Sequence, residues 1–216
     1  MERPIIKRLG LVEFEPTWRA MQRLNKSRAP ETPDEIWLLQ HPPVFTLGLA
    51  GKPEHVLAPG DIPVIKIDRG GQVTYHGPGQ LVLYLLLDIR RLGFGVKELV
   101  KRIEQSVIDL LAEYGIDSFR RNGMPGVYVS SKIESPSKIS AIGLRVANHA
   151  TYHGLSLNID MDLEPFSRIN PCGYEGLAVT QMRDCAADFG NEDKMHLIGD
   201  SLVAHLTQQL YGPHHG

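Results

Sequence analysis

The chain has 216 residues, of which 42% are hydrophobic and 22% are charged, and its formal net charge is −2 at pH 7. This length is typical of a single globular domain, here residues 1–216, and the composition is ordinary for a soluble protein. A charge so close to zero provides no broad basic field, which argues against duplex nucleic acid or an anionic lipid surface as a partner.

The sequence shows no segment typical of export or membrane insertion. The first residues, MERPIIKRLG, lack the apolar stretch of a signal peptide, and the apolar run LVLYLLLDI from Leu81 is far shorter than the ~20 residues that span a bilayer. The two cysteines, Cys172 and Cys185, form no CxxC pair, so we expect neither a disulfide framework nor a cysteine-rich zinc site. These features predict a cytoplasmic protein that does not bind a membrane.

In the first half of the chain, the hydrophobic pattern predicts one helix and three strands. Trp18, Met21 and Leu24 have the spacing of one helix face. The third strand is almost continuously apolar, which is typical of a strand covered on both faces. The predicted helix covers residues 16–29, and the predicted strands cover residues 36–39, 63–67 and 80–89.

In the second half, a helix with a long apolar stripe is followed by three strands and a terminal helix. Gly115 is placed to end the first helix, and Gly212 with Pro213 ends the last one. The predicted ranges are 96–115, 126–130, 138–146, 152–159 and 194–212. Strands cluster in the middle of the chain without strict βαβ alternation. The pattern therefore predicts an α+β fold, with a mixed, mostly antiparallel β-sheet flanked by helices.

The densest unusual segment is DRGGQVTYHGPGQ, residues 68–80. Its glycines allow backbone to approach a ligand closely, and Arg69, Thr74, Tyr75 and His76 add side chains that can bind a ligand. We expect a binding loop held by a rigid sheet rather than a plain hairpin. The segment lacks the GxGxxG and GK[ST] spacings, so it gives no support for ATP or NAD binding.

Two further segments carry residues that can do chemistry. Lys138 opens a predicted strand that contains small residues, although a lysine in this position is also typical of a solvated sheet edge. His149 and His153 are four residues apart and would share a face of a continuous strand. They have no companion carboxylate or cysteine motif, so no metal site is predicted.

Cys172 lies between Pro171 and Gly173 in SRINPCGYEG, a pattern typical of a rigid turn. A cysteine is a nucleophile only as its thiolate, which a nearby ammonium or imidazole favours. The sequence offers several such neighbours and does not choose among them: Lys138, His76, His149 and His153. Cys185 has no turn signal, and we assign it to packing.

Together, RGGQVTYHGPGQ, KISAIGLRV, HGLSLNID and INPCGY resemble the motifs of the lipoyl(octanoyl) transferase family, in the family's order over about half of the chain, residues 69–174. No motif position departs from the family pattern. The resemblance implies a fold similar to the catalytic domain of biotin and lipoate protein ligases. It also implies transfer of an octanoyl group through a cysteine thioester, without ATP or a metal.

The resemblance also assigns roles to residues. The implied catalytic pair is Cys172 and Lys138, with the Lys138 ammonium favouring the thiolate. His149 and His153 are candidate supporting residues. The implied substrate-binding residues are Arg69, Gly70, Gly71, Gln72, Val73, Thr74, Tyr75, His76, Ala141, Ile142, Gly143, Gly154, Leu155 and Ser156.

The partners implied by the resemblance are acyl carrier protein as octanoyl donor, and lipoyl domains of 2-oxoacid dehydrogenase complexes and glycine cleavage H protein as acceptors. Three alternatives stay open at this point. An ATP-dependent lipoate or biotin protein ligase would need an adenylate but no cysteine nucleophile. A thioesterase would need a histidine relay, which is not evident in the sequence. A non-catalytic module would only bind lipoyl domains or acyl chains.

Overall fold

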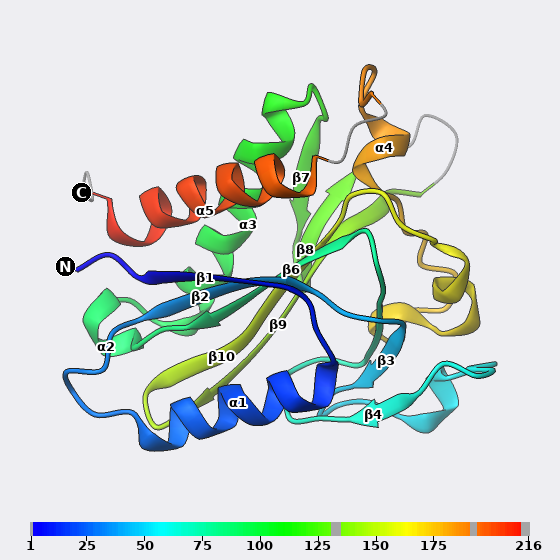
Figure 1. Cartoon of the computed structure of the whole chain (residues 1–216). Helices are drawn as coiled ribbons and strands as arrows, with labels where there is room; N and C mark the ends of the chain where they lie inside the picture. Colours follow the sequence, from blue (N-terminus) through cyan, green and yellow to red (C-terminus); the bar gives the residue numbers. More distant parts are fainter. Residues whose placement is uncertain (1, 131–134, 191–193, 213–216) are drawn as a thin grey trace.

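The structure is a computed structural model that describes residues 2–130, 135–190 and 194–212 (Figure 1). Its centre is a seven-stranded sheet in the order β1-β2-β6-β10-β9-β8-β7. β1 pairs with β2 in parallel, and the other neighbours pair antiparallel. These strands are β1 (Ile5–Leu11), β2 (Glu35–Gln40), β6 (Gln80–Leu86), β7 (Ser118–Arg121), β8 (Met124–Val129), β9 (Ser137–Ala147) and β10 (Ala150–Asn158).

A three-stranded sheet in the order β4-β3-β5 lies beside the large sheet (Figure 1). Its strands are β3 (Val44–Leu47), β4 (Val64–Lys66) and β5 (Val73–His76). The helices are α1 (Phe14–Ser27), α2 (Ile89–Leu92), α3 (Val96–Glu113), α4 (Met182–Cys185) and α5 (Met195–Tyr211). Short 3₁₀ turns are η1 (Pro53–His55), η2 (Glu164–Arg168) and η3 (Pro171–Gly173). The two sheets and their flanking helices confirm the predicted α+β class.

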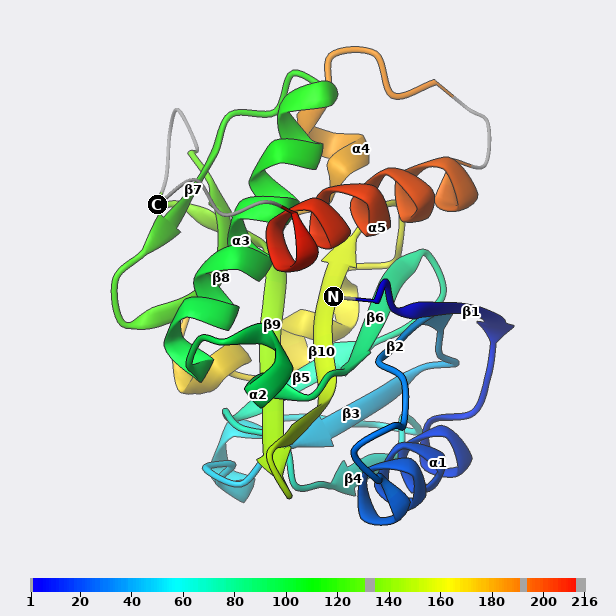
Figure 2. The same cartoon turned by 90° about the vertical axis from the view of Figure 1, so that its left-hand side faces the viewer.

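β6 divides the interior into two cores, because its side chains alternate between the two faces of the sheet. On the face covered by α3 and α5, which lie side by side (Figure 2), the buried side chains are Leu81, Leu83 and Leu85. On the face covered by α1 they are Val82, Tyr84 and Leu86. Each fully buried leucine contributes about 1.5–3 kcal/mol relative to an exposed one. The prediction of a strand covered on both faces is confirmed.

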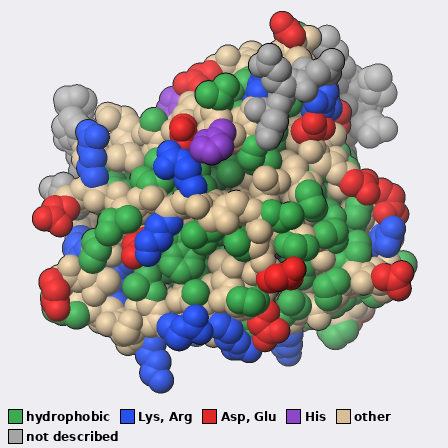
Figure 3. All heavy atoms as spheres, in the orientation of Figure 1, with side chains coloured by type: hydrophobic (Ala, Val, Ile, Leu, Met, Phe, Trp, Pro, Cys, Tyr) green, Lys and Arg blue, Asp and Glu red, His purple; other side chains and the backbone are tan. Residues whose placement is uncertain are grey.

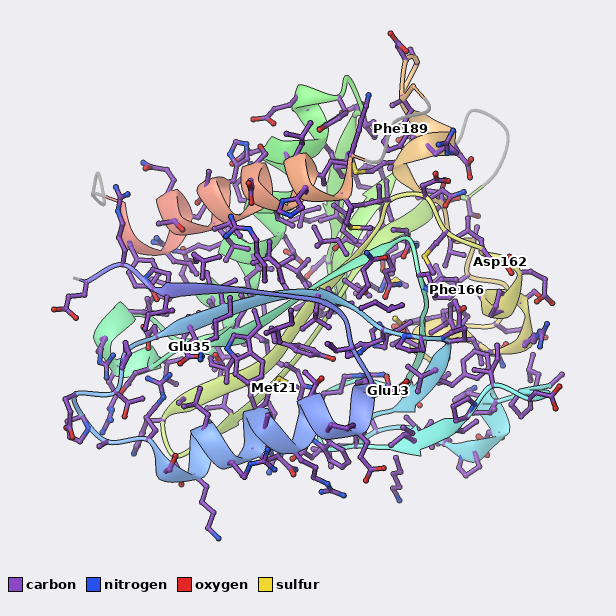
Figure 4. The ribbon with its side chains drawn as sticks, in the orientation of Figure 1. Glu13, Met21, Glu35, Asp162, Phe166 and Phe189 are labelled. Atoms are coloured by element: carbon purple, nitrogen blue, oxygen red, sulfur yellow. The ribbon has the colours of Figure 1, made fainter. Side chains whose placement is uncertain are left out.

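α1 closes the second core with one apolar face. Met21 is fully buried and points from α1 toward the sheet (Figure 4). In Figure 3, Lys and Arg side chains gather along the lower edge of the molecule, over α1, whereas acidic, basic and apolar side chains are interspersed on the rest of this face. None of the described helices is long and apolar enough to cross a membrane.

The sequence pattern missed three strands and misassigned part of one segment. β1 is an exposed edge strand interrupted by charged residues and Gly10, and β3 and β7 are only four residues long, so none shows a clear alternation. The predicted binding loop at residues 68–80 contains β5, which pairs antiparallel with β3. That pairing, formed by residues distant in sequence, turns residues 73–76 of the expected loop into strand.

Candidate active site

A cavity of about 360 Å³ lies over β9 and β10 and extends to β5, β6 and the first turn of α1. This volume is within the usual range for small-molecule sites. Along β9, Lys138 is five residues from Gly143, which pairs with Gly154, which in turn pairs with Tyr84 of β6. Gly143, Gly154 and Tyr84 lie side by side on three neighbouring strands. At about 3.3–3.4 Å per residue, this row lies roughly 17 Å from Lys138 along the strand direction. The cavity is long and crosses three strands.

Nearly all of the predicted site residues line this cavity. They are Arg69, Gly70, Gly71, Gln72, Val73, Thr74, His76, Lys138, Ala141, Ile142, Gly143, His153, Gly154, Leu155, Ser156 and Cys172. Tyr75 does not: it packs with Phe45 and Phe166 in a third core beneath the small sheet. Phe166 lies in η2 beside that sheet (Figure 4).

At one end of the cavity, Cys172 and Lys138 form a pair that we call the dyad. Lys138 Nζ lies 3.0 Å from Cys172 Sγ and donates a second hydrogen bond to Pro125 O at 3.1 Å. Lys138 is only 4% exposed, whereas Cys172 is half-buried. The buried ammonium therefore donates directly to a sulfur in the cavity wall.

Cys172 lies in a strained turn. Its φ of 58° and ψ of 14° lie in the left-handed region, which residues other than glycine rarely adopt. Such a residue costs about 1–3 kcal/mol and persists only where the surrounding structure enforces it. The following Gly173 is also left-handed, with φ of 78°. The turn thus presents the sulfur toward Lys138 at a cost in stability.

Backbone hydrogen bonds tie Lys138 to the chain that follows this turn. Lys138 N donates to Ala178 O at 2.8 Å, and Thr180 N donates to Lys138 O at 3.0 Å. Gly126, on the neighbouring strand, has φ of 126°, and a Cβ there would meet Ser140 O at 2.4 Å. Glycine is therefore required where β8 passes the lysine, and the two halves of the dyad are held by one local network.

The charge of Lys138 depends on its neighbours. Burial by itself lowers the pKa of Lys138, but the Cys172 sulfur and the Tyr128 side chain outweigh burial, and the pKa is raised. Lys138 is therefore an ammonium at neutral pH. If the sulfur lost its charge, burial would be the largest influence left on the lysine.

Arg69 adds a second buried cation near the sulfur. Its guanidinium donates to Thr46 O at 2.7 Å, to Thr46 Oγ1 at 2.9 Å and to Gly70 O at 2.9 Å. Burial lowers the pKa of Arg69 to about 10, and the nearby Cys172 opposes that change, so Arg69 is charged at pH 7. A Cβ at Gly143 would approach Arg69 Cδ to 2.9 Å, which explains the glycine there.

A different cluster, which we call the Asp68 hub, joins α1 to the sheet at the other end. The Asp68 carboxylate accepts hydrogen bonds from four side chains: Trp18, Gln22, Tyr152 and His153. Successive strand residues normally point to opposite faces, but His153 has φ of 60°, which lets Tyr152 and His153 reach the same carboxylate. Burial would raise the pKa of Asp68, but the hydrogen bonds, with that from His153 the largest, hold it well below its ordinary range.

Two more histidines lie beside the hub. His41 Nδ1 lies 2.6 Å from Val12 O, which only accepts, so His41 Nε2 accepts from the Tyr84 hydroxyl at 2.7 Å. His76 Nδ1 donates to Gln80 Oε1 at 2.7 Å. Burial is the main reason that the pKa of His41 is lowered to about 4 and that of His76 to about 3. Both imidazoles are neutral at pH 7.

Sequence reasoning missed the hub and overvalued one histidine. Asp68 opens the glycine-rich segment, and its position beside Arg69 was the only signal available. His149 lies exposed in the turn between β9 and β10, outside the cavity lining. His149 and His153 do not share the face of a continuous strand, because both have φ of 60°. Within the described ranges, no group of three or more His, Cys, Asp or Glu residues is placed to hold a metal ion.

The sequence and the fold both match known proteins. Residues 14–204 match the family model of the lipoyl protein ligase A/B catalytic domain. The chain is 60% identical over 207 residues to "Octanoyltransferase" of Dechloromonas aromatica (strain RCB), which covers 96% of this chain and 97% of the relative.

Two solved structures illustrate the likeness in fold. One is lipoate-protein ligase A bound with ATP, with a TM-score of 0.74, 12% identity and coverage of 97% of this chain and 86% of that one. The other is biotin protein ligase from Aquifex aeolicus in complex with biotin and ATP, with a TM-score of 0.58, 12% identity and coverage of 95% and 70%. At such low identity the likeness concerns the fold alone, and it confirms the fold that the motifs implied.

Proposed function

The chain belongs to the octanoyltransferase family of acyltransferases, and we propose that it moves an octanoyl group from acyl carrier protein to a lysine of a lipoyl domain, through a thioester on Cys172. The observation that carries this proposal is the 3.0 Å contact between Lys138 Nζ and Cys172 Sγ in the wall of a 360 Å³ cavity. The acceptors, in line with the family motifs, are lipoyl domains of 2-oxoacid dehydrogenase complexes and glycine cleavage H protein.

In the first step, the Cys172 thiolate attacks the carbonyl carbon of the octanoyl thioester on the donor. A new carbon–sulfur bond forms, the bond to the donor sulfur breaks, and the departing thiolate takes a proton from the Lys138 ammonium. The exchange of one thioester for another needs no energy source. It leaves an uncharged sulfur beside a neutral, buried Lys138 amine, the form that burial favours.

In the second step, the amine of the acceptor lysine attacks the octanoyl-Cys172 carbonyl. The nitrogen gives its proton to the Lys138 amine, the amide bond forms, and Cys172 departs as a thiolate. The starting ammonium–thiolate pair is restored, and the net products are the octanoyl amide and the free donor thiol. Because an amide is more stable than a thioester, the reaction requires neither ATP nor a metal.

Lys138 is better suited than the histidines to carry these protons. A general base works best when its pKa lies near the working pH, and acylation of Cys172 removes the charge that raises the pKa of Lys138, so that burial lowers it toward that range. With a pKa of about 3, His76 is too weak a base to hold a proton at neutral pH. His153 is hydrogen-bonded to Asp68, and burial lowers its pKa even so.

The middle of the cavity fits a narrow apolar chain. Gly143 and Gly154 pair directly across β9 and β10 in the cavity lining. A Cβ at Gly154 would meet Leu83 O at 1.9 Å, so no side chain can be accommodated there without moving the backbone. The two glycines let Arg69 and the β6 backbone pack closely against β9 and β10, and we propose that the acyl chain lies over this flat part of the sheet.

A ligase-type reaction is the second candidate, because the fold is shared with ATP-dependent ligases. In that reaction the acyl group would be activated as an adenylate, and Cys172 would have no covalent role. The sequence lacks the common phosphate-binding spacings, and the dyad would then have no purpose. The two reactions differ in their need for ATP.

The test is to incubate the protein with octanoyl-acyl carrier protein without ATP and to record its intact mass. We expect one octanoyl adduct on the wild type and on Cys185→Ala, but none on Cys172→Ala. Adding a lipoyl domain should discharge the adduct and acylate that domain. Full transfer by Cys172→Ala, or transfer only when ATP and free octanoate are supplied, would overturn the proposal.

A further inference from the structure

Tyr128 lies against the dyad from the neighbouring strand. It is the direct partner of Lys138 in the β8–β9 pair, so the two side chains lie on the same face of the sheet. Tyr128 is fully buried, and Lys138 Nζ lies 5.1 Å from the centre of its ring. An ammonium at this distance from an aromatic ring is attracted to the ring's negative face.

The hydroxyl of Tyr128 is an exception among the buried polar groups. It is buried, and in the resting dyad it makes no hydrogen bond of normal geometry within the part of the chain that the structure describes, although Lys138 lies beside it. A buried hydroxyl without a partner is destabilising, and a phenylalanine would fill the same space without that cost. The hydroxyl also lies close enough to Lys138 to help raise the pKa of that lysine.

We infer that Tyr128 is the positioning residue of Lys138, and that its hydroxyl accepts an N–H of Lys138 once Cys172 has been acylated. In the resting dyad, the Lys138 ammonium donates to Cys172 Sγ and to Pro125 O. Acylation turns the sulfur into a poor acceptor, and the ammonium gives up one proton to the departing donor thiolate.

The remaining Lys138 amine has two N–H groups and one lone pair. With one N–H on Pro125 O and the other on the Tyr128 hydroxyl, the lone pair is left facing the acylated sulfur, where the acceptor amine must lose its proton. The titratable and charged groups that face Lys138 are Cys172 from η3 and Tyr128 from β8. Arg121 Cζ lies beyond them, 5.3 Å from the same ring centre.

This role presupposes the two-step transfer proposed above, and the two half-reactions separate the two ideas. The variant is Tyr128→Phe, which keeps the ring face and removes the hydroxyl. The matched control is Tyr211→Phe, which removes a hydroxyl that donates to Asp34 at 2.9 Å and does not line the cavity. Each protein is acylated with octanoyl-acyl carrier protein, and discharge to a lipoyl domain is followed in single turnover from pH 6 to 9.

For Tyr128→Phe we expect the plateau rate of discharge to fall about tenfold, with a smaller loss, within about threefold, in acylation. The rising limb of the discharge profile should move to lower pH, because a contact that raises the Lys138 pKa is gone. A purely structural defect would lower the rate without moving the limb. Thermal unfolding of Tyr128→Phe should show a melting temperature no lower than that of the wild type.

The outcomes are distinguishable. If Tyr128→Phe discharges at the wild-type rate with an unchanged pH profile, Tyr128 has no positioning role and the proposed function stands. An unmoved limb with a lowered melting temperature also overturns the role. If the wild type forms no acyl-enzyme at all, it is the proposed function that fails. Tyr211→Phe should lose thermal stability but keep both half-reactions.

Discussion

The two ends of the cavity differ in how completely their polar side chains are hydrogen-bonded. At the dyad end, Cys172 is strained, a neighbouring sulfur raises the pKa of Lys138, and the Tyr128 hydroxyl makes no hydrogen bond within the described part of the chain. At the hub end, Asp68 accepts four hydrogen bonds, and His41 and His76 are each hydrogen-bonded to a fixed partner. We propose that the strained and incompletely paired groups of the dyad end carry out the chemistry, whereas the fully hydrogen-bonded groups of the hub end stabilise the fold.

The largest expected effect is on the dyad. Lys138→Met should slow octanoyl transfer by about 10³- to 10⁴-fold, because it removes both the partner of the thiolate and the acid–base group. The free energy of unfolding should change little, since methionine fills the same space without a buried charge. Initial rates and urea unfolding measure the two effects. If Lys138→Met kept a tenth of the wild-type activity, the proposed role of the dyad end in the chemistry would be wrong.

A lower pH should destabilise the fold through the two histidines beside the hub. His41 and His76 stay neutral in the folded protein down to pKa values of about 4 and about 3, whereas in the unfolded chain they bind protons below about pH 6.5. The unfolded state therefore binds more protons between pH 6.5 and 4, and stability falls as the pH falls. At pH 5 each histidine should lower the free energy of unfolding by on the order of 2 kcal/mol, at about 1.36 kcal/mol per pH unit.

Urea unfolding at pH 7.5, 6 and 5 measures this loss. His41→Gln should reduce the pH dependence by about half, because glutamine cannot take up a proton in the unfolded chain. Equal stability of the wild type at pH 7.5 and 5 would contradict the assignment of two buried neutral histidines.

Asp68→Asn should mainly destabilise the fold. The amide nitrogen would face donors such as Trp18 Nε1 and His153 Nε2, and the charge that strengthens their hydrogen bonds would be lost. We expect a loss of about 2–3 kcal/mol in the free energy of unfolding. The rate of transfer per folded molecule should fall less than tenfold. Glu164→Gln, an exposed carboxylate paired with Arg168, serves as the control and should change stability by less than about 1 kcal/mol.

The smallest expected effect is a gain in stability from a substitution that removes activity. Cys172→Gly should abolish transfer and yet raise the free energy of unfolding by about 1 kcal/mol relative to Cys172→Ala, because glycine adopts φ of 58° without strain. Thermal and urea unfolding of the two inactive variants provide the comparison. Equal stability would mean that the turn stores no strain at this position.

The sequence was sufficient for much of this structure, and where it failed the reasons are physical. Long periodic elements such as α3 and β6 were predicted because their burial pattern is local. Edge and four-residue strands were missed because pairing with distant partners creates them. The motifs brought Cys172 and Lys138 forward, but a sequence does not show that two residues 34 positions apart have atoms in contact at 3.0 Å.

The Asp68 hub and Tyr128 were beyond sequence reasoning for a related reason. Asp68 matters because Trp18 and Tyr152 reach it from other elements, and one left-handed residue, His153, makes that possible. Tyr128 drew attention because its buried hydroxyl makes no hydrogen bond within the described part of the chain. Neither the contacts of Asp68 nor the surroundings of the Tyr128 hydroxyl can be predicted from the local hydrophobic pattern.

The alternation along β6 has a consequence for how such enzymes can diversify. Val82 and Tyr84 face the cavity, while Leu81, Leu83 and Leu85 belong to the core beneath α3 and α5. Substitutions at Val82 and Tyr84 can therefore reshape the cavity without touching the core beneath α3 and α5, and they alter only the smaller core that α1 closes. One face of β6 can thus change with the substrate while the other face keeps the larger core, and a library at Val82 and Tyr84, screened for folding as well as activity, would explore substrate range.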